Sequence, residues 1–118
     1  MNTRISTGEA YEIIGRWASE RLRVVFAMEF LNCACSIQRS GLMDHMRPGV
    51  FIHRSGDASA TVQAAKFGEI VFLDDPDYQG LRFRERAGIS GCEVVLIADV
   101  NGDLTADSLL LLSQMVTG

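Results

Sequence analysis

Residues 22–37 read LRVVFAMEFLNCACSI, a stretch that is too apolar to face water and too rich in β-branched and aromatic side chains to favour a helix. Alternate side chains from Leu22 to Phe30 share one face of a strand, and the alternation changes phase at Leu31 and Asn32. Such a change requires a bulge, a bend or a turn, because a one-residue slip sends every side chain to the opposite face. We therefore expect the central strand, or a bent pair of strands, of a small sheet.

Length and composition indicate one domain over residues 1–118, long enough to bury roughly 65% of its unfolded surface. No apolar run approaches the roughly 20 residues of a membrane span, and the first residues lack the apolar segment of a signal peptide. We therefore expect a cytoplasmic location. Three cysteines, an odd number, do not form a disulfide framework, so we expect reduced core thiols. The net charge of −4 disfavours nonspecific nucleic-acid binding.

Two helices are predicted, one near each end of the chain. Ser6 and Glu9 have the spacing of a capping box and begin a helix over residues 7–20, whose apolar side chains recur on one face. A second helix is expected over residues 106–116, with Thr105 as its N-cap. Both helices present apolar faces that a sheet or a partner subunit can cover.

The segments between the helices alternate in the manner of strands. Strands are expected over residues 50–54, 58–67, 69–73, 81–86 and 92–100. A turn or a glycine bend is expected at 39–41, and turns at 48–49 and 55–57. The predicted fold class is therefore α+β and mainly antiparallel, a curved sheet or a partly open small barrel with N-terminal and C-terminal helices.

Arg82, Arg84 and Arg86 alternate with Leu81, Phe83 and Glu85. In a strand, these three guanidinium groups lie on one face about 7 Å apart, and we name them the arginine stripe. Such a stripe suits a phosphate or carboxylate partner. The alternative is an edge strand whose charges protect it against aggregation.

Residues 99–103, DVNGD, are similar to the opening of an EF-hand or dockerin calcium loop. Leu104 and Leu110 stand where that loop needs a glycine and a bidentate acid, so we interpret the segment as a turn that leads into a helix. Cys33 and Cys35 lack the usual spacing of zinc ligands. We expect no metal, no cofactor and no catalytic residue.

The chain resembles the Sm-like small β-barrel proteins in its N-terminal helix followed by short, bent strands. Residues 66–72, KFGEIVF, resemble the entry to their fourth strand, and Asp44-His45-Met46 resembles part of their first motif. The resemblance implies a small barrel that forms an RNA-binding ring, although Phe72-Leu73-Asp74 occupies the place of the family's second RNA-contacting motif.

The leading hypothesis from the sequence is a noncatalytic, self-associating binding module for an unidentified ligand, possibly anionic. Trp17, Leu109 and Leu112 would form the interface between subunits, and the arginine stripe would face the ligand. One alternative is a small enzyme or sensor that holds an apolar molecule in the concavity of the sheet, beside His45 or His53. The other alternative is the Sm-like RNA-binding ring.

Overall fold

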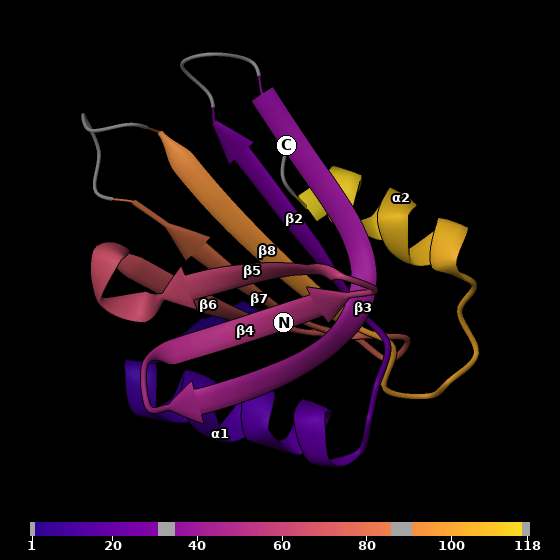
Figure 1. Ribbon diagram of the computed structural model, residues 1–118, viewed down its shortest axis with the longest axis horizontal. Coiled ribbons are helices and arrows are strands. Elements are labelled where there is room, and N and C mark those ends of the chain that lie inside the picture. Colours follow the sequence, from indigo (N-terminus) through magenta and orange to yellow (C-terminus); the bar gives the residue numbers. More distant parts are fainter. Residues whose placement is uncertain (1, 31–34, 86–90, 117–118) are drawn as a thin grey trace.

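The chain forms a curved antiparallel sheet that carries one helix on each face (Figure 1). The computed structural model describes residues 2–30, 35–85 and 91–116, and within these ranges it contains eight strands, two α-helices and one 3-10 helix. The predicted α+β class, mainly antiparallel with a helix near each end, is confirmed. The elements are β1 (Asn2–Arg4), α1 (Thr7–Ser19), β2 (Val24–Phe30), β3 (Cys35–Arg47), β4 (Val50–Ser55), β5 (Ala58–Gln63), η1 (Ala64–Lys66), β6 (Glu69–Asp74), β7 (Gln79–Arg84), β8 (Cys92–Ala98) and α2 (Ala106–Val116).

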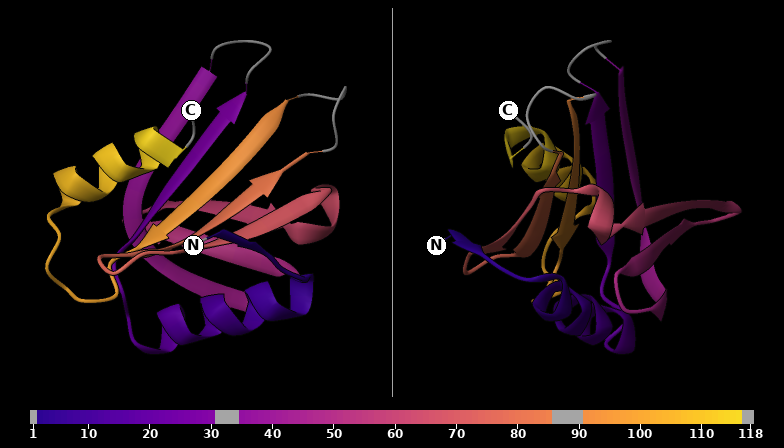
Figure 2. Two further views of the ribbon diagram at one scale, coloured as in Figure 1. Left: turned by 180° about the vertical axis from the view of Figure 1, so that it is seen from behind. Right: turned by 90° about the vertical axis from the view of Figure 1, so that its left-hand side faces the viewer.

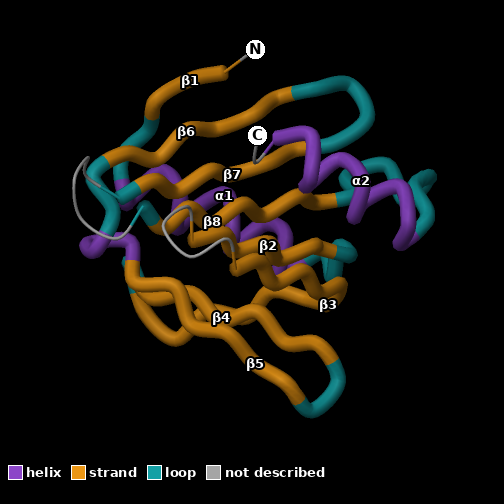
Figure 3. Tube along the Cα trace, turned by 90° about the horizontal axis from the view of Figure 1, so that it is seen from above, coloured by secondary structure: helices purple, strands orange, loops and turns teal. Residues whose placement is uncertain are grey.

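The strands follow the order β1-β6-β7-β8-β2-β3-β4-β5, and Figure 3 shows them side by side in this order. The stretch that organises the sequence supplies β2 and the start of β3, which pair antiparallel from Val24 opposite Gly41 to Phe30 opposite Cys35. A bent pair of strands in the middle of the sheet is thus confirmed. The phase change at Leu31 and Asn32 lies outside the described residues.

The long strand β3 connects the two halves of the curved sheet. Its first half pairs with β2, and its second half, from Leu42, pairs with β4. Gly41 stands at the junction, where an added Cβ would overlap the carbonyl oxygen of Arg54. Residues 39–41 therefore form no chain-reversing turn. Gly41 lies within β3, where the strand changes partner from β2 to β4 and two strands approach closely.

Helix α1 lies on the inside of the curl (Figure 2). Its capping box is present, since the Ser6 side chain accepts from the Glu9 amide and the Glu9 carboxylate accepts from the Ser6 amide. The buried face of the helix packs against side chains from both halves of the sheet, among them Val24, Phe51 and Phe83. The main core therefore lies between α1 and the concave face.

Helix α2 packs on the opposite face of the sheet, over β2, β8 and β3. The hydroxyl of Thr105 accepts from the Ser108 amide, as expected for the N-cap. Leu109 is fully buried against a second cluster that includes Val25, Val95 and Ile97. The central strands are thus covered on both faces, and they position the ends of both helices beside the middle of β3.

Candidate functional site

The arginine stripe is ion-paired within the sheet. Strand β7 lies between β6 and β8, so it is an interior strand. The Nε atoms of Arg82 and Arg84 lie 3.8 Å and 3.5 Å from Oε1 of Glu93 on β8. Arg86 lies outside the described residues. Sequence periodicity placed Arg82 and Arg84 on one face, but the acid that pairs with them comes from a neighbouring strand.

Glu93 is a buried carboxylate, 5% exposed, and burial raises its pKa although Arg84 and Arg82 oppose the shift. Glu29 stands directly opposite it on β2, which adds to the rise. A buried oxygen of each glutamate and Nε of Arg82 form no hydrogen bond with described residues. This cluster makes the interior charge balance sensitive to protonation. The Arg82 side chain is only 18% exposed, whereas that of Arg84 is 45% exposed.

His53 is part of the core. Its side chain is 1% exposed, its ring stacks on Phe26, and its Nε2–H donates to the carbonyl oxygen of Val24 at 2.8 Å. Burial lowers the pKa of this imidazole, with a smaller effect in the same direction from Arg39. The ring is therefore neutral at pH 7, and it connects β4 to β2 instead of facing a ligand. The side chain of His45, the alternative histidine, lies outside what is described.

The structure places two of the three expected interface residues inside the chain. Trp17 is 1% exposed, and its indole Nε1 donates to Oε1 of Gln79. Leu109 is fully buried and Leu112 is half-buried against the core beneath α2. Leu111 is a large apolar residue of α2 that is 60% exposed to solvent.

The DVNGD segment is a turn, and the Asp99 carboxylate accepts hydrogen bonds from within it. The two carboxylate oxygens of Asp99 accept from the backbone amides of Gly102 and Leu104, and the side-chain Nδ2 of Asn101 donates to the Pro76 carbonyl. No group of three or more metal-ligating side chains occurs among the described residues. Asp99 therefore orders the approach to α2.

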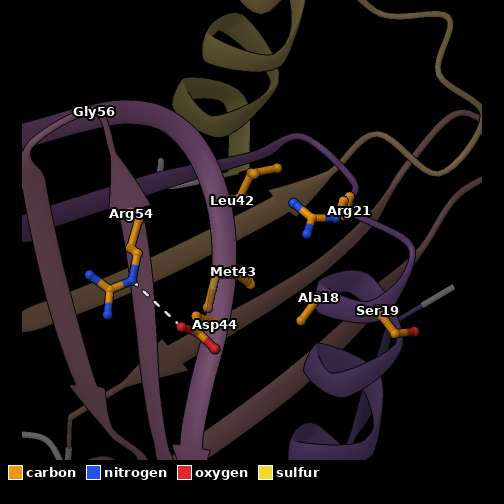
Figure 4. Close-up of a pocket in the computed structure, with 8 residues that line it drawn as sticks. All are labelled: Ala18, Ser19, Arg21, Leu42, Met43, Asp44, Arg54 and Gly56. Atoms are coloured by element: carbon orange, nitrogen blue, oxygen red, sulfur yellow. Dashed lines mark ion pairs between the residues drawn. The ribbon is translucent and has the colours of Figure 1, made fainter.

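One cavity lined by described residues is a groove between the C-terminal end of α1 and the second half of β3 (Figure 4). Its volume is about 570 Å³. Apolar atoms come from Ala18, Leu42 and Met43, and charge comes from Arg21, Arg54 and Asp44. An adjoining depression of about 510 Å³ shares Arg21 and Leu42 and adds Arg23. We name these two cavities together the arginine groove.

Arg21 occupies an unusual backbone position at the end of α1. Its φ is +52°, in the left-handed region that glycine usually fills at a helix C-terminus. The amide of Arg21 donates to the Ala18 carbonyl and that of Leu22 to the Trp17 carbonyl, so the helix ends in a Schellman-type arrangement. An arginine in this position costs about 1–2 kcal/mol of backbone strain.

Sequence reasoning missed the arginine groove. Its residues come from α1, β3 and β4, and they carry no common motif. One local signal existed, because the chain has Arg21 where a predicted helix end would normally have glycine.

No protein-family description matches the chain, and no curated protein is similar to it in sequence. Solved structures do share its fold. Holo-PhuS, a heme-binding protein from Pseudomonas aeruginosa, aligns with a TM-score of 0.60 at 12% identity, over 91% of this chain and 32% of PhuS. ChuX aligns with a TM-score of 0.52 at 16% identity, over 98% of this chain and 75% of ChuX. A protein from Agrobacterium tumefaciens aligns with a TM-score of 0.54 at 13% identity, over 97% of this chain and 69% of that protein.

The likeness is one of fold, and this chain spans about a third of the length of PhuS. It corrects two expectations. The Sm-like resemblance is wrong, because the matching structures share this open antiparallel sheet with its helices. The hypothesis of a module for an unidentified, possibly anionic ligand and the alternative of an RNA-binding ring are also wrong. The solved structures that share the fold include PhuS, a heme-binding protein, and within this chain His53 is buried in the core and Arg82 and Arg84 are paired with Glu93.

Proposed function

We propose that this chain binds heme in the arginine groove. The observation that carries the proposal is a cavity with an apolar wall and a cationic rim, on a chain whose fold matches a heme-binding protein over 91% of its length. Heme is a flat apolar macrocycle with two carboxylates at one edge. It therefore needs both kinds of surface in one place.

The residues of the groove fit the two organic parts of heme. The volume of about 570 Å³ lies within the range of roughly 300–1,000 Å³ that is usual for small-molecule sites. Ala18, Leu42 and Met43 supply apolar contact for the macrocycle. Arg21 and Arg54 supply guanidinium groups, which pair with carboxylates through two parallel hydrogen bonds.

The iron ligand is the more restricted part of the fit. His53 donates to Val24, and the thioether of Met43 is buried in the main core at 5% exposed, so the described residues at the groove offer heme iron no accessible ligand. When bound, the iron would supply a Lewis-acidic and redox-active centre. The chain's own residues would bind the macrocycle, orient its carboxylates and exclude water from one face.

The test is a titration of the purified chain with hemin, followed by the Soret absorbance. We expect saturation at one hemin per chain. Leu42→Asp should weaken binding at least tenfold, because it places a negative charge against the macrocycle at a position that is 41% exposed and therefore tolerates a polar residue. Circular dichroism of the variant checks that it is folded.

Two matched variants separate the groove from nonspecific adsorption. Leu111→Ser removes an exposed leucine on α2, and Arg16→Ala removes an exposed arginine on α1 outside the groove. Both should bind hemin as the wild type does. Non-saturating absorbance changes, or a Leu42→Asp variant that binds normally, would contradict the proposal.

Homo-oligomerisation and a cytoplasmic location stay predictions from the sequence. Neither helix in the described part of the chain is long and apolar enough to cross a membrane. The exposed Leu111 supports a contact between copies through α2. Light scattering on a size-exclusion column measures the mass, and a 13.0 kDa species at every concentration would contradict self-association.

A further inference from the structure

The sheet has two edge strands, and the chain protects them differently. Strand β1 at one edge is three residues long and carries Arg4, whose guanidinium group pairs with Glu69 on β6. Strand β5 at the other edge (Figure 3) spans six residues, Ala58–Gln63, and contains neither a charged residue nor a proline. A short or charged edge strand discourages pairing with another chain, whereas a longer neutral one permits it. Strand β5 is therefore the edge at which a further strand can add.

The backbone of β5 directs hydrogen-bonding groups away from β4. The amide of Ala64 donates to the carbonyl of Gly49 at 2.8 Å, so these two residues form a hydrogen-bonded pair of the antiparallel ladder. Strands β4 and β5 keep one register, along which hydrogen-bonded and non-hydrogen-bonded pairs alternate. The residues of β5 at the non-hydrogen-bonded positions therefore direct their N–H and C=O groups outward. These residues are Ser59, Thr61 and Gln63, and their side chains are exposed.

Opposite charges flank this strand. Asp57 precedes β5 in the turn after β4, and Lys66 follows it at the end of η1. Both residues are exposed, and neither forms an ion pair with another described residue. Antiparallel pairing of two copies of β5 brings the acidic end of each strand beside the basic end of the other. The edge is thus complementary to itself, as the interface of a two-fold dimer must be, which favours a second copy of this chain as the occupant.

We propose that two copies of the chain pair antiparallel through β5, with Thr61 opposite Thr61 on the two-fold axis and Ser59 opposite Gln63. This register sets the outward N–H and C=O groups of the two strands against one another. It also brings Asp57 of each copy near Lys66 of the other. The two sheets then continue into each other across the axis. This contact is separate from the one through α2, and it does not depend on heme binding.

The pair should be weak and should dissociate on dilution. The two strands contribute about six backbone hydrogen bonds. The ion pairs at the strand ends are exposed, so water screens their charges. These gains must offset the translational and rotational freedom that two free chains lose on association.

Light scattering on a size-exclusion column, over a range of concentrations, measures the association. The parent for all variants is Leu111→Ser, which removes the exposed leucine of α2 and leaves β5 unchanged. This parent should approach twice the 13.0 kDa mass of the chain as the concentration rises. Thr61→Lys should raise the dissociation constant about tenfold or more, because it sets two positive charges opposite each other on the axis. Thr61→Val, the control, keeps an uncharged β-branched side chain and should pair as the parent does.

Charge reversal at the strand ends tests the antiparallel orientation. Asp57→Lys and Lys66→Asp should each weaken pairing about twofold to fivefold, a range set by the small contribution of an exposed ion pair. The double variant should regain the affinity of the parent, because opposite charges meet again. Asp77→Lys reverses a charge on the exposed loop between β6 and β7 and should leave the association unchanged.

The outcomes decide whether β5 is the contact. Circular dichroism checks that each variant is folded. A 13.0 kDa species at every concentration, also for the wild type, would overturn the proposal and leave the edge to a strand of another protein. Association that Leu111→Ser abolishes, or that Thr61→Lys leaves intact, would place the contact elsewhere and would equally overturn it. Hemin titration is a separate measurement, so none of these results bears on heme binding.

Discussion

Replacing Arg21 with glycine should make the chain more stable and should weaken its binding of hemin. The φ of +52° at Arg21 is strained for a side chain with a Cβ and costs nothing for glycine. The hydrogen bonds from Arg21 and Leu22 to the last turn of α1 use backbone atoms, so they persist in the variant. The change relaxes the helix end and removes a guanidinium group from the groove.

The size of the stabilisation follows from two opposing terms. Relief of the left-handed strain contributes about 1–2 kcal/mol. The larger backbone entropy of glycine in the unfolded chain costs about 0.5–1 kcal/mol. The net gain is about 0.5–1 kcal/mol. An unfolding entropy of about 2.1 cal/mol/K per residue gives roughly 0.25 kcal/mol/K for 118 residues, so Tm should rise by about 2–4 °C.

Thermal unfolding followed by circular dichroism measures the stability, and hemin titration measures the affinity. Arg21→Ala is the matched control, because it removes the guanidinium group and keeps a Cβ at the strained position. It should lose affinity to the same extent as Arg21→Gly without gaining stability. If both variants have the same Tm, the strain at the end of α1 is not a stored cost and the reasoning is refuted.

Three further predictions concern the fold and its buried charges. Gly41→Ala should lower the free energy of unfolding, measured by urea titration, by about 2–3 kcal/mol, because the new Cβ meets the Arg54 carbonyl. Gly8→Ala in α1 is the control. It has open space for the new Cβ and should not destabilise the chain. The pKa of His53 is lowered, so the folded state binds fewer protons than the unfolded state. The contribution of His53 to thermal stability should be full above pH 6.5, its ordinary pKa, and should fall as the pH decreases. His53→Gln should reduce that fall. The pKa of Glu93 is raised, so its contribution to stability should decline as the pH rises above 4.5. Thermal unfolding of Glu93→Gln should show no such decline. For either residue, stability profiles against pH that run parallel in the wild type and the variant would contradict the assignment.

The sequence predicted the local elements well. The capping box at Ser6 and Glu9 fixed the start of α1, and apolar spacing identified its buried face, since both signals lie within a few residues of each other. Alternation located β2 and β7, because a strand with one covered face has apolar residues at every second position. Short apolar runs bounded by turn residues located β4, β6 and β8.

Strand order and the approach of distant segments were decided by the tertiary structure. Glu93 meets Arg82 and Arg84 because β8 pairs with β7, and no period within either strand specifies that neighbour. Gly41 resembles a turn residue in the sequence, but the proximity of Arg54 makes it a site of close strand packing.

The arginine groove shows the same division. Sequence alone determined that Arg21 follows a helix and that Leu42 and Arg54 belong to extended segments. Only the folded chain brings the end of α1, the second half of β3 and β4 around one cavity. Periodicity reports which face of an element is buried, whereas a binding site depends on which elements meet, and that is set by long-range packing of the whole sheet.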